Sequence, residues 1–122
     1  MNRVVHFEIA AEQPDRATKF YSDIFGWQIN KWEGPMPYWL IKTGEQGETG
    51  IDGAIFERKE NWPTIVNTIE VASVDDFNEK IKKAGGEVVT PKDAIPGVGY
   101  MSYCRDTEGN IFGIMQNDPN AK

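Results

Sequence analysis

The chain has 122 residues, of which 39% are hydrophobic and 26% charged, so it is long enough for one globular domain with a buried core. Its net charge of −6 and its lack of any basic cluster exclude nucleic acid as an expected partner. No apolar run approaches the roughly 20 residues that span a membrane, and the single cysteine, Cys104, fits a reducing compartment, so we expect a cytoplasmic protein without a membrane partner.

The chain starts with a strand-like segment, RVVHFEIA, at residues 3–10, which holds the only histidine. Successive side chains of a strand point to opposite faces of a sheet. The apolar residues Val5, Phe7 and Ile9 are therefore expected to pack under a helix, while His6 and Glu8 point to the other face.

A helix is predicted next, from Pro14 to the glycine at position 26. Proline suits the first helical turn, and glycine is a common residue just after a helix end. The apolar residues recur at helical spacing and form one face. We expect this face to pack against the first strand, mainly through Phe20, Ile24 and Phe25.

Three strand-like segments follow, at residues 27–32, 38–43 and 51–57, and residues 60–64 are the expected join to a second half. The second half repeats the first. The segment HFEIA at 6–10 resembles TIEVA at 68–72, which lies 62 positions further along.

The second half also continues with a helix and three strand-like segments. The helix is predicted to begin after Ser73, a good N-cap, and to end at Gly85 and Gly86. The strands are expected at 86–90, 100–105 and 111–116, with a loop rich in proline and glycine at 90–99. The chain is thus predicted to be a single domain, 1–122, in which a β-α-β-β-β unit occurs twice, as module one (about 1–58) and module two (about 64–118).

The arrangement resembles the vicinal oxygen chelate superfamily, which includes glyoxalase I, bleomycin resistance proteins and extradiol dioxygenases. The motifs that carry the resemblance are the early His6, FY at 20–21, FGW at 25–27, AGGEVV at 84–89 and RDTEGNIFGIMQ at 105–116. IPGVGY at 95–100 is most similar to a bacterial glyoxalase-like branch. The resemblance implies an α+β fold of two tandem βαβββ modules, with a mixed sheet curled around a cup, and commonly a homodimer.

The resemblance also implies a divalent metal in the cup, held by about four His, Glu or Gln side chains from the first and last strand of each module. His6 matches one position. The other three positions carry Thr68 or Val66, Gly53 and Gly113, which cannot replace such ligands. We therefore expect no metal and no other cofactor, and the alternative is a metal held weakly by His6 and Glu8.

Several residues are expected to face a ligand. The family pattern places Trp39, Met101 and Tyr103 on the cup side as an apolar and aromatic wall, although such residues also commonly fill a core. Glu70 shares that side by strand alternation. Gly53 and Gly113 are expected to lower the cup floor beside the ligand, or else to relieve a bend in the sheet.

His6 and Glu8 are the candidate catalytic residues, because an imidazole beside a carboxylate can act as a general base. The alternative is that His6 is only a hydrogen-bonded structural residue.

Three functions follow from these observations. The first is metal-independent binding of a small organic molecule, the second is a lyase or isomerase that uses His6 and Glu8 with or without a metal, and the third is a non-catalytic accessory subunit.

Overall fold

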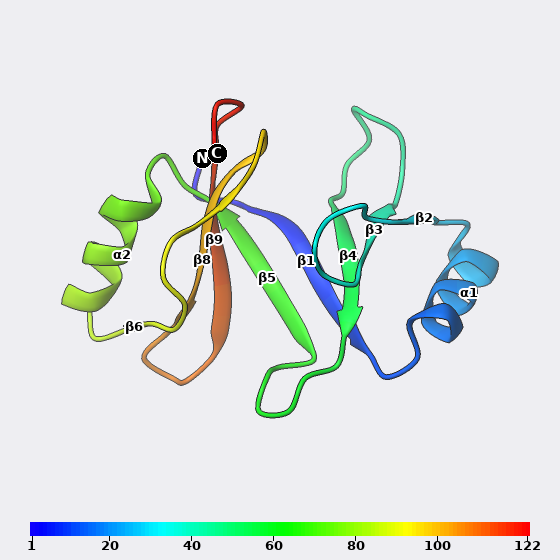
Figure 1. Cartoon of the computed structure of the whole chain (residues 1–122), viewed down its shortest axis with the longest axis horizontal. Helices are drawn as coiled ribbons and strands as arrows, with labels where there is room; N and C mark the ends of the chain where they lie inside the picture. The colour runs from blue at the N-terminus through cyan, green and yellow to red at the C-terminus, as the bar shows by residue number, and fades with distance from the viewer. The chain divides into compact units, whose positions relative to one another are not determined.

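The computed structural model describes all residues from 1 to 122 and divides them into two compact units. One unit contains residues 6–66, and the other contains residues 1–5 and 67–122. We call them module one and module two. The strands Val4–Ala11 and Ile65–Glu70 cross the boundary, and each is described with the module that holds most of its residues. Each has one helix and one group of paired strands (Figure 1), which confirms the α+β class and the repeated βαβββ unit. No helix is long and apolar enough to cross a membrane.

Module one is built from five elements in chain order. They are β1 (Val4–Ala11), α1 (Pro14–Phe25), β2 (Gln28–Lys31), β3 (Tyr38–Lys42) and β4 (Asp52–Glu57). The strand order is β2-β3-β4-β1, in which β1 is parallel to β4 and the other neighbours are antiparallel. The sequence signals at both ends of α1 are confirmed, because Pro14 occupies the first turn and Gly26 ends the helix with φ of 71°.

The packing of α1 differs from the expectation. Phe20, Ile24 and Phe25 were predicted to pack on the first strand, but they are 56%, 61% and 59% exposed. The helix contacts the core through Ala17 and Tyr21 instead. Tyr21 stacks on Trp27, with ring centroids 5.1 Å apart, and Trp27 in turn contacts Phe7. We attribute the difference to Trp27, whose large indole fills the space between helix and sheet.

Module two contains β5 (Ile65–Glu70), α2 (Val74–Lys83), β6 (Glu87–Val88), β7 (Asp93–Ile95), β8 (Gly99–Arg105) and β9 (Ile111–Asn117). The strand order is β5-β9-β8-β6, with β7 also paired to β8. Strand β7 lies within the predicted 90–99 loop, so this part of the prediction was wrong. Three residues are too short a run to produce a recognisable alternation.

The core of module two lies against one face of α2. Ser73 caps α2, since its Oγ accepts a hydrogen bond from the Asp76 backbone N–H. The apolar face of α2 packs on a fully buried cluster that includes Cys104. Burial raises the pKa of the Cys104 thiol, so the group remains protonated and unreactive at neutral pH.

Candidate functional site

Three polar side chains form a continuous hydrogen-bonded chain on the face of module one that α1 does not cover. Strand β1 supplies His6 and Glu8, and β3 supplies Tyr38. The Tyr38 hydroxyl lies 2.8 Å from His6 Nε2 and donates a hydrogen bond of 2.7 Å to Glu8 Oε2. Glu8 is only 5% exposed, so the hydroxyl of Tyr38 supports a carboxylate that has lost most of its water.

The direction of these hydrogen bonds determines the tautomer of His6. A tyrosine hydroxyl has one hydrogen, and Tyr38 gives it to Glu8. The Tyr38 oxygen can then only accept from His6, so the hydrogen of the neutral imidazole is on Nε2. Nδ1 is left with a lone pair that can accept a proton or a hydrogen bond.

Burial lowers the pKa of His6, because the protonated imidazole loses hydration inside the protein. The negative charges of Glu8 and Asp52 act in the opposite direction but are smaller effects. His6 is therefore neutral at pH 7. A neutral imidazole with one nitrogen held by the protein has the form that a general base needs.

The segment between β2 and β3 positions Tyr38. The ring of Trp32 meets the ring of Tyr38 edge to face, with centroids 5.9 Å apart. The Trp32 backbone N–H also donates to the Tyr38 carbonyl at 2.7 Å. A side chain at Gly34 would overlap the Trp32 indole, so glycine is required there for the indole to fold back toward Tyr38.

Two of the predicted ligand-facing residues of module one lie on the opposite, helix-covered face. Trp39 pairs with Ile55 and packs on the buried cluster beneath α1. Gly53 pairs with Phe7, and a Cβ at Gly53 would lie 2.6 Å from the Phe7 ring. The prediction of their face was wrong, because the module-two pattern was transferred one residue out of register, which reverses every side chain of a strand.

The same shift explains why sequence reasoning missed Tyr38. Alternation along β3 places Tyr38 on the face opposite to Trp39 and Ile41. The burial of Ile41, at 2% exposure, shows which set faces the core. The signal in the sequence that could have indicated Tyr38 is its polar hydroxyl, on the strand face opposite to the apolar Trp39 and Ile41.

In module two, Met101, Tyr103 and Gly113 lie on the helix-free face, as expected, because their neighbours Ser102 and Ile114 face the core with α2. Gly113 does not form an open floor. A Cβ there would lie 2.9 Å from Thr68 Oγ1 and 3.5 Å from Tyr103 Cε1, so these two side chains cover the glycine.

Glu70 lies on the helix-free face of module two, on the same strand face as Thr68. Its carboxylate accepts a hydrogen bond from the Asn117 side-chain amide. Glu70 is therefore held by a neighbour within module two, and nothing in its contacts links it to the His6 network.

The donor set does not fit the divalent metal of the superfamily. Nowhere do three His, Cys, Asp or Glu side chains gather in a way that could hold a metal ion. In module one the Tyr38 hydroxyl bridges His6 and Glu8, the two side chains that would have to share the ion. In module two, Thr68 pairs with Gly113, and neither is a ligand of the expected kind.

Comparisons with known proteins agree with this fold. Residues 3–114 match the family model described as Glyoxalase/Bleomycin resistance protein/Dioxygenase superfamily. A glyoxylase-like domain-containing protein of Didymella fabae is 31% identical over 113 residues, which are 88% of each chain. CFP32 of Mycobacterium tuberculosis, which is named as a glyoxylase, is 31% identical over 106 residues, or 82% of this chain, but the match spans only 40% of its length.

Solved structures show the same fold at low identity. Methylmalonyl-CoA epimerase from Mycobacterium tuberculosis is 15% identical with a TM-score of 0.74, over 95% of this chain and 88% of that one. A single-residue variant of the Streptomyces coelicolor methylmalonyl-CoA epimerase, in complex with 2-nitronate-propionyl-CoA, is also 15% identical with a TM-score of 0.74, over 100% of this chain and 99% of that one. At this identity the likeness supports the fold alone.

Proposed function

The chain belongs to the Glyoxalase/Bleomycin resistance protein/Dioxygenase superfamily, and we propose that it binds a small organic molecule without the superfamily metal, through the helix-free face of module one. One observation carries this proposal: the Tyr38 hydroxyl bridges His6 and Glu8 at hydrogen-bond distances. The Tyr38 hydroxyl thus lies between His6 and Glu8, in the position that a metal ion bound by both side chains would occupy.

The same network indicates what kind of ligand would bind. Because His6 Nε2 is held by Tyr38, the imidazole offers Nδ1 as an acceptor. The matching ligand presents an O–H, an N–H or an acidic C–H to that nitrogen. Aromatic neighbours such as Trp32 favour a ligand with an apolar or flat body.

The test uses the fact that His6 is the only histidine, so selective ¹⁵N-histidine labelling gives one unambiguous set of imidazole signals. Catechol and lactate serve as probes that present an O–H, and phenylpyruvate serves as a probe that presents an acidic C–H beside its carbonyl. We expect at least one to shift the Nδ1 signal in a saturable manner, and the shift to weaken in Tyr38→Phe. If none of the three moves the imidazole signals, the binding proposal fails.

A parallel titration with Zn²⁺, Ni²⁺ and Mn²⁺ tests the metal-free part of the proposal. We expect no stoichiometric metal that survives a chelator wash. A stoichiometric ion that is lost in the His6→Gln variant would overturn it.

Proton transfer is the second candidate function, and the neutral Nδ1 of His6 favours it. His6 would take a proton from a substrate C–H bond next to a carbonyl, the bonding pair would move into an enolate, and the proton would return to carbon. The Glu8 carboxylate, acting through Tyr38, would stabilise the imidazolium formed in between. One relative, from Vibrio parahaemolyticus, is named as a probable lactoylglutathione lyase and is 26% identical over 94% of this chain.

Deuterium exchange distinguishes the two candidates. The protein is incubated with methylmalonyl-CoA and phenylpyruvate in D₂O, and NMR follows deuterium at the carbon beside the carbonyl. Exchange above the uncatalysed rate that disappears in His6→Gln supports proton transfer. Binding without exchange supports the binding function alone. The homodimer and the cytoplasmic location expected from the sequence stay predictions.

A further inference from the structure

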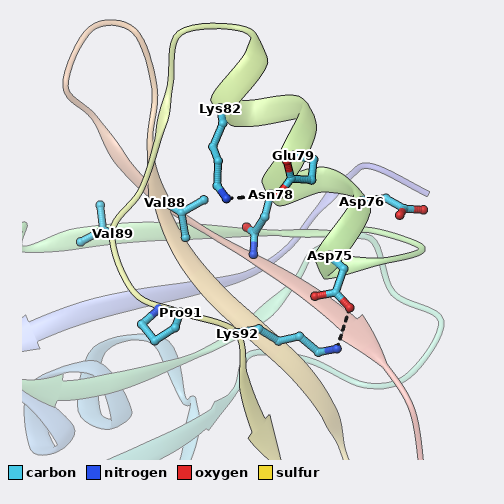
Figure 2. Close-up of a pocket in the computed structure, with 9 residues that line it drawn as sticks. All are labelled: Asp75, Asp76, Asn78, Glu79, Lys82, Val88, Val89, Pro91 and Lys92. Carbon is cyan, nitrogen blue, oxygen red and sulfur yellow. Dashed lines mark hydrogen bonds and ion pairs between the residues drawn. The ribbon is translucent and has the colours of Figure 1, made fainter.

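A groove of about 620 Å³ lies within module two, between α2 and residues 88–92 (Figure 2). One wall is a single face of α2, since positions three, four and seven residues apart lie together on a helix. The other wall is the segment after β6. The side chains that matter here are Asp75, Asn78, Lys82, Val88, Pro91 and Lys92.

Asn78 is the unusual member of this groove. It is only 9% exposed, and its Oδ1 accepts hydrogen bonds from Ser102 Oγ at 2.9 Å and from Cys104 Sγ at 3.6 Å. The carbonyl end of the amide is thereby held toward the core. The amide nitrogen makes no hydrogen bond within the protein and lines the groove. This nitrogen is not one of the buried atoms that lack a partner, so it remains accessible to water from the groove, and a ligand that replaces the water must supply an acceptor.

Both lysines of the groove make ion pairs, and Lys92 also lies over the Tyr100 ring, 4.6 Å from its centroid. A third carboxylate, Asp76, lines the groove without an ion pair. Lys92 Nζ lies 2.9 Å from Asp75 Oδ2, and Lys82 Nζ lies 3.1 Å from Glu79 Oε1 (Figure 2). Exposed pairs of this kind contribute little to stability. Either ammonium group can therefore exchange its partner for a negatively charged ligand without a large loss.

We propose that this groove binds a small carboxylate with a short aliphatic body. The carboxylate accepts the hydrogen bonds of the Asn78 amide nitrogen and gains charge compensation from Lys82 and Lys92. The aliphatic body lies against Val88 and Pro91. A free amine is not the expected ligand, because the buried Asn78 group is a hydrogen-bond donor and would oppose a second donor.

This site is independent of the His6 network, since every residue of the groove belongs to module two. The experiment is a butyrate titration of ¹⁵N-labelled protein, followed through the side-chain NH₂ signals of Asn78. Butyrate is expected to shift these signals in a saturable manner. Butylammonium at the same ionic strength is the matched probe and is expected to leave them unchanged.

The variant Asn78→Asp tests the role of the amide nitrogen most directly. Its carboxylate can still accept from Ser102, but it presents an oxygen rather than N–H to the groove. We expect butyrate affinity to fall about tenfold or more. The variant loses the N–H donor, and its negative carboxylate repels the negative carboxylate of butyrate.

Surface variants keep the proposal testable if Asn78→Asp fails to fold. Lys82→Gln and Lys92→Gln are each expected to weaken butyrate binding by about two- to fivefold, the range of an exposed charge pair. Lys83→Gln is the control, because Lys83 lies on the same helix but outside the groove. The proposal is wrong if butyrate leaves the Asn78 signals unchanged, or if all three lysine variants bind it equally.

Discussion

The hydroxyl oxygen of Tyr38 lies 2.8 Å from Nε2 of His6, although the two residues are 32 positions apart in the chain. This contact assigns the hydrogen of the neutral imidazole to Nε2, because the same hydroxyl donates its own hydrogen to Glu8. It makes His6 one end of a three-residue network, and it leaves the Nδ1 lone pair outside that network.

The first prediction concerns the charges around His6. Glu8→Gln is expected to lower the His6 pKa further, because it removes the larger of the two negative charges that favour the imidazolium. Asp52→Asn is the matched variant and should lower the pKa by a smaller amount, because Asp52 is the weaker influence. NMR titration of the single imidazole measures both, and a rise in either variant would contradict the assignment.

The second prediction concerns stability against pH. The His6 pKa in the folded protein lies below its usual value of about 6.5, so the unfolded chain binds the proton at a higher pH. The free energy of unfolding should therefore decline as the pH falls below about 6.5, and should level off below the folded pKa. Urea unfolding at pH 7.5 and pH 5.5 measures this decline.

The control for that decline is His6→Gln, which has no group titrating in this range. Its free energy of unfolding should change less between pH 7.5 and pH 5.5 than that of the wild type. An equal decline in the two proteins would show that other groups cause it.

The third prediction separates Tyr38 from its neighbour Trp39. Tyr38→Phe removes the bridging hydroxyl and should change the ¹⁵N shifts of both imidazole nitrogens, at a cost of roughly 1–3 kcal/mol for the hydrogen bond that the buried Glu8 loses. Trp39→Phe alters packing on the helix-covered face and should leave the imidazole shifts nearly unchanged. If Trp39→Phe changed the imidazole shifts and Tyr38→Phe did not, Trp39 rather than Tyr38 would be the residue beside His6.

The fourth prediction concerns the two glycines. Gly113→Ala should cost about 1–3 kcal/mol of unfolding free energy, because its Cβ would lie 2.9 Å from Thr68 Oγ1. The double variant Gly113→Ala with Thr68→Ala should recover part of that loss, since the obstructing hydroxyl is gone. Chemical denaturation measures the recovery.

Gly53→Ala is the contrasting case. Its Cβ would lie 2.5 Å from the backbone oxygen of Phe7, and no side-chain substitution removes that atom. We therefore expect Gly53→Ala to be at least as destabilising as Gly113→Ala and not to be rescued by Phe7→Leu. A rescue by Phe7→Leu would show that only the ring obstructs this position.

Much of the fold could be predicted because its signals are local. The proline and glycine that bound α1 and the serine that caps α2 act within a few residues of themselves, so composition and spacing identify them. The alternation of β1 likewise placed His6 and Glu8 together on the face opposite to Phe7. Strand β7 was missed because three residues carry too little pattern.

The candidate site could be predicted only in part. The sequence by itself determined that His6 and Glu8 share one face of β1 and that the βαβββ unit occurs twice. The family resemblance implied that Gly113, and either Thr68 or Val66, occupy positions where metal ligands would stand. Tertiary structure alone decided which face of β3 meets the two β1 side chains, because a shift of one residue in the pairing with β4 exchanges Tyr38 for Trp39. Strand register depends on contacts between distant segments, and the hydrogen bonds that join Tyr38 to His6 and Glu8 exist only once that register is formed.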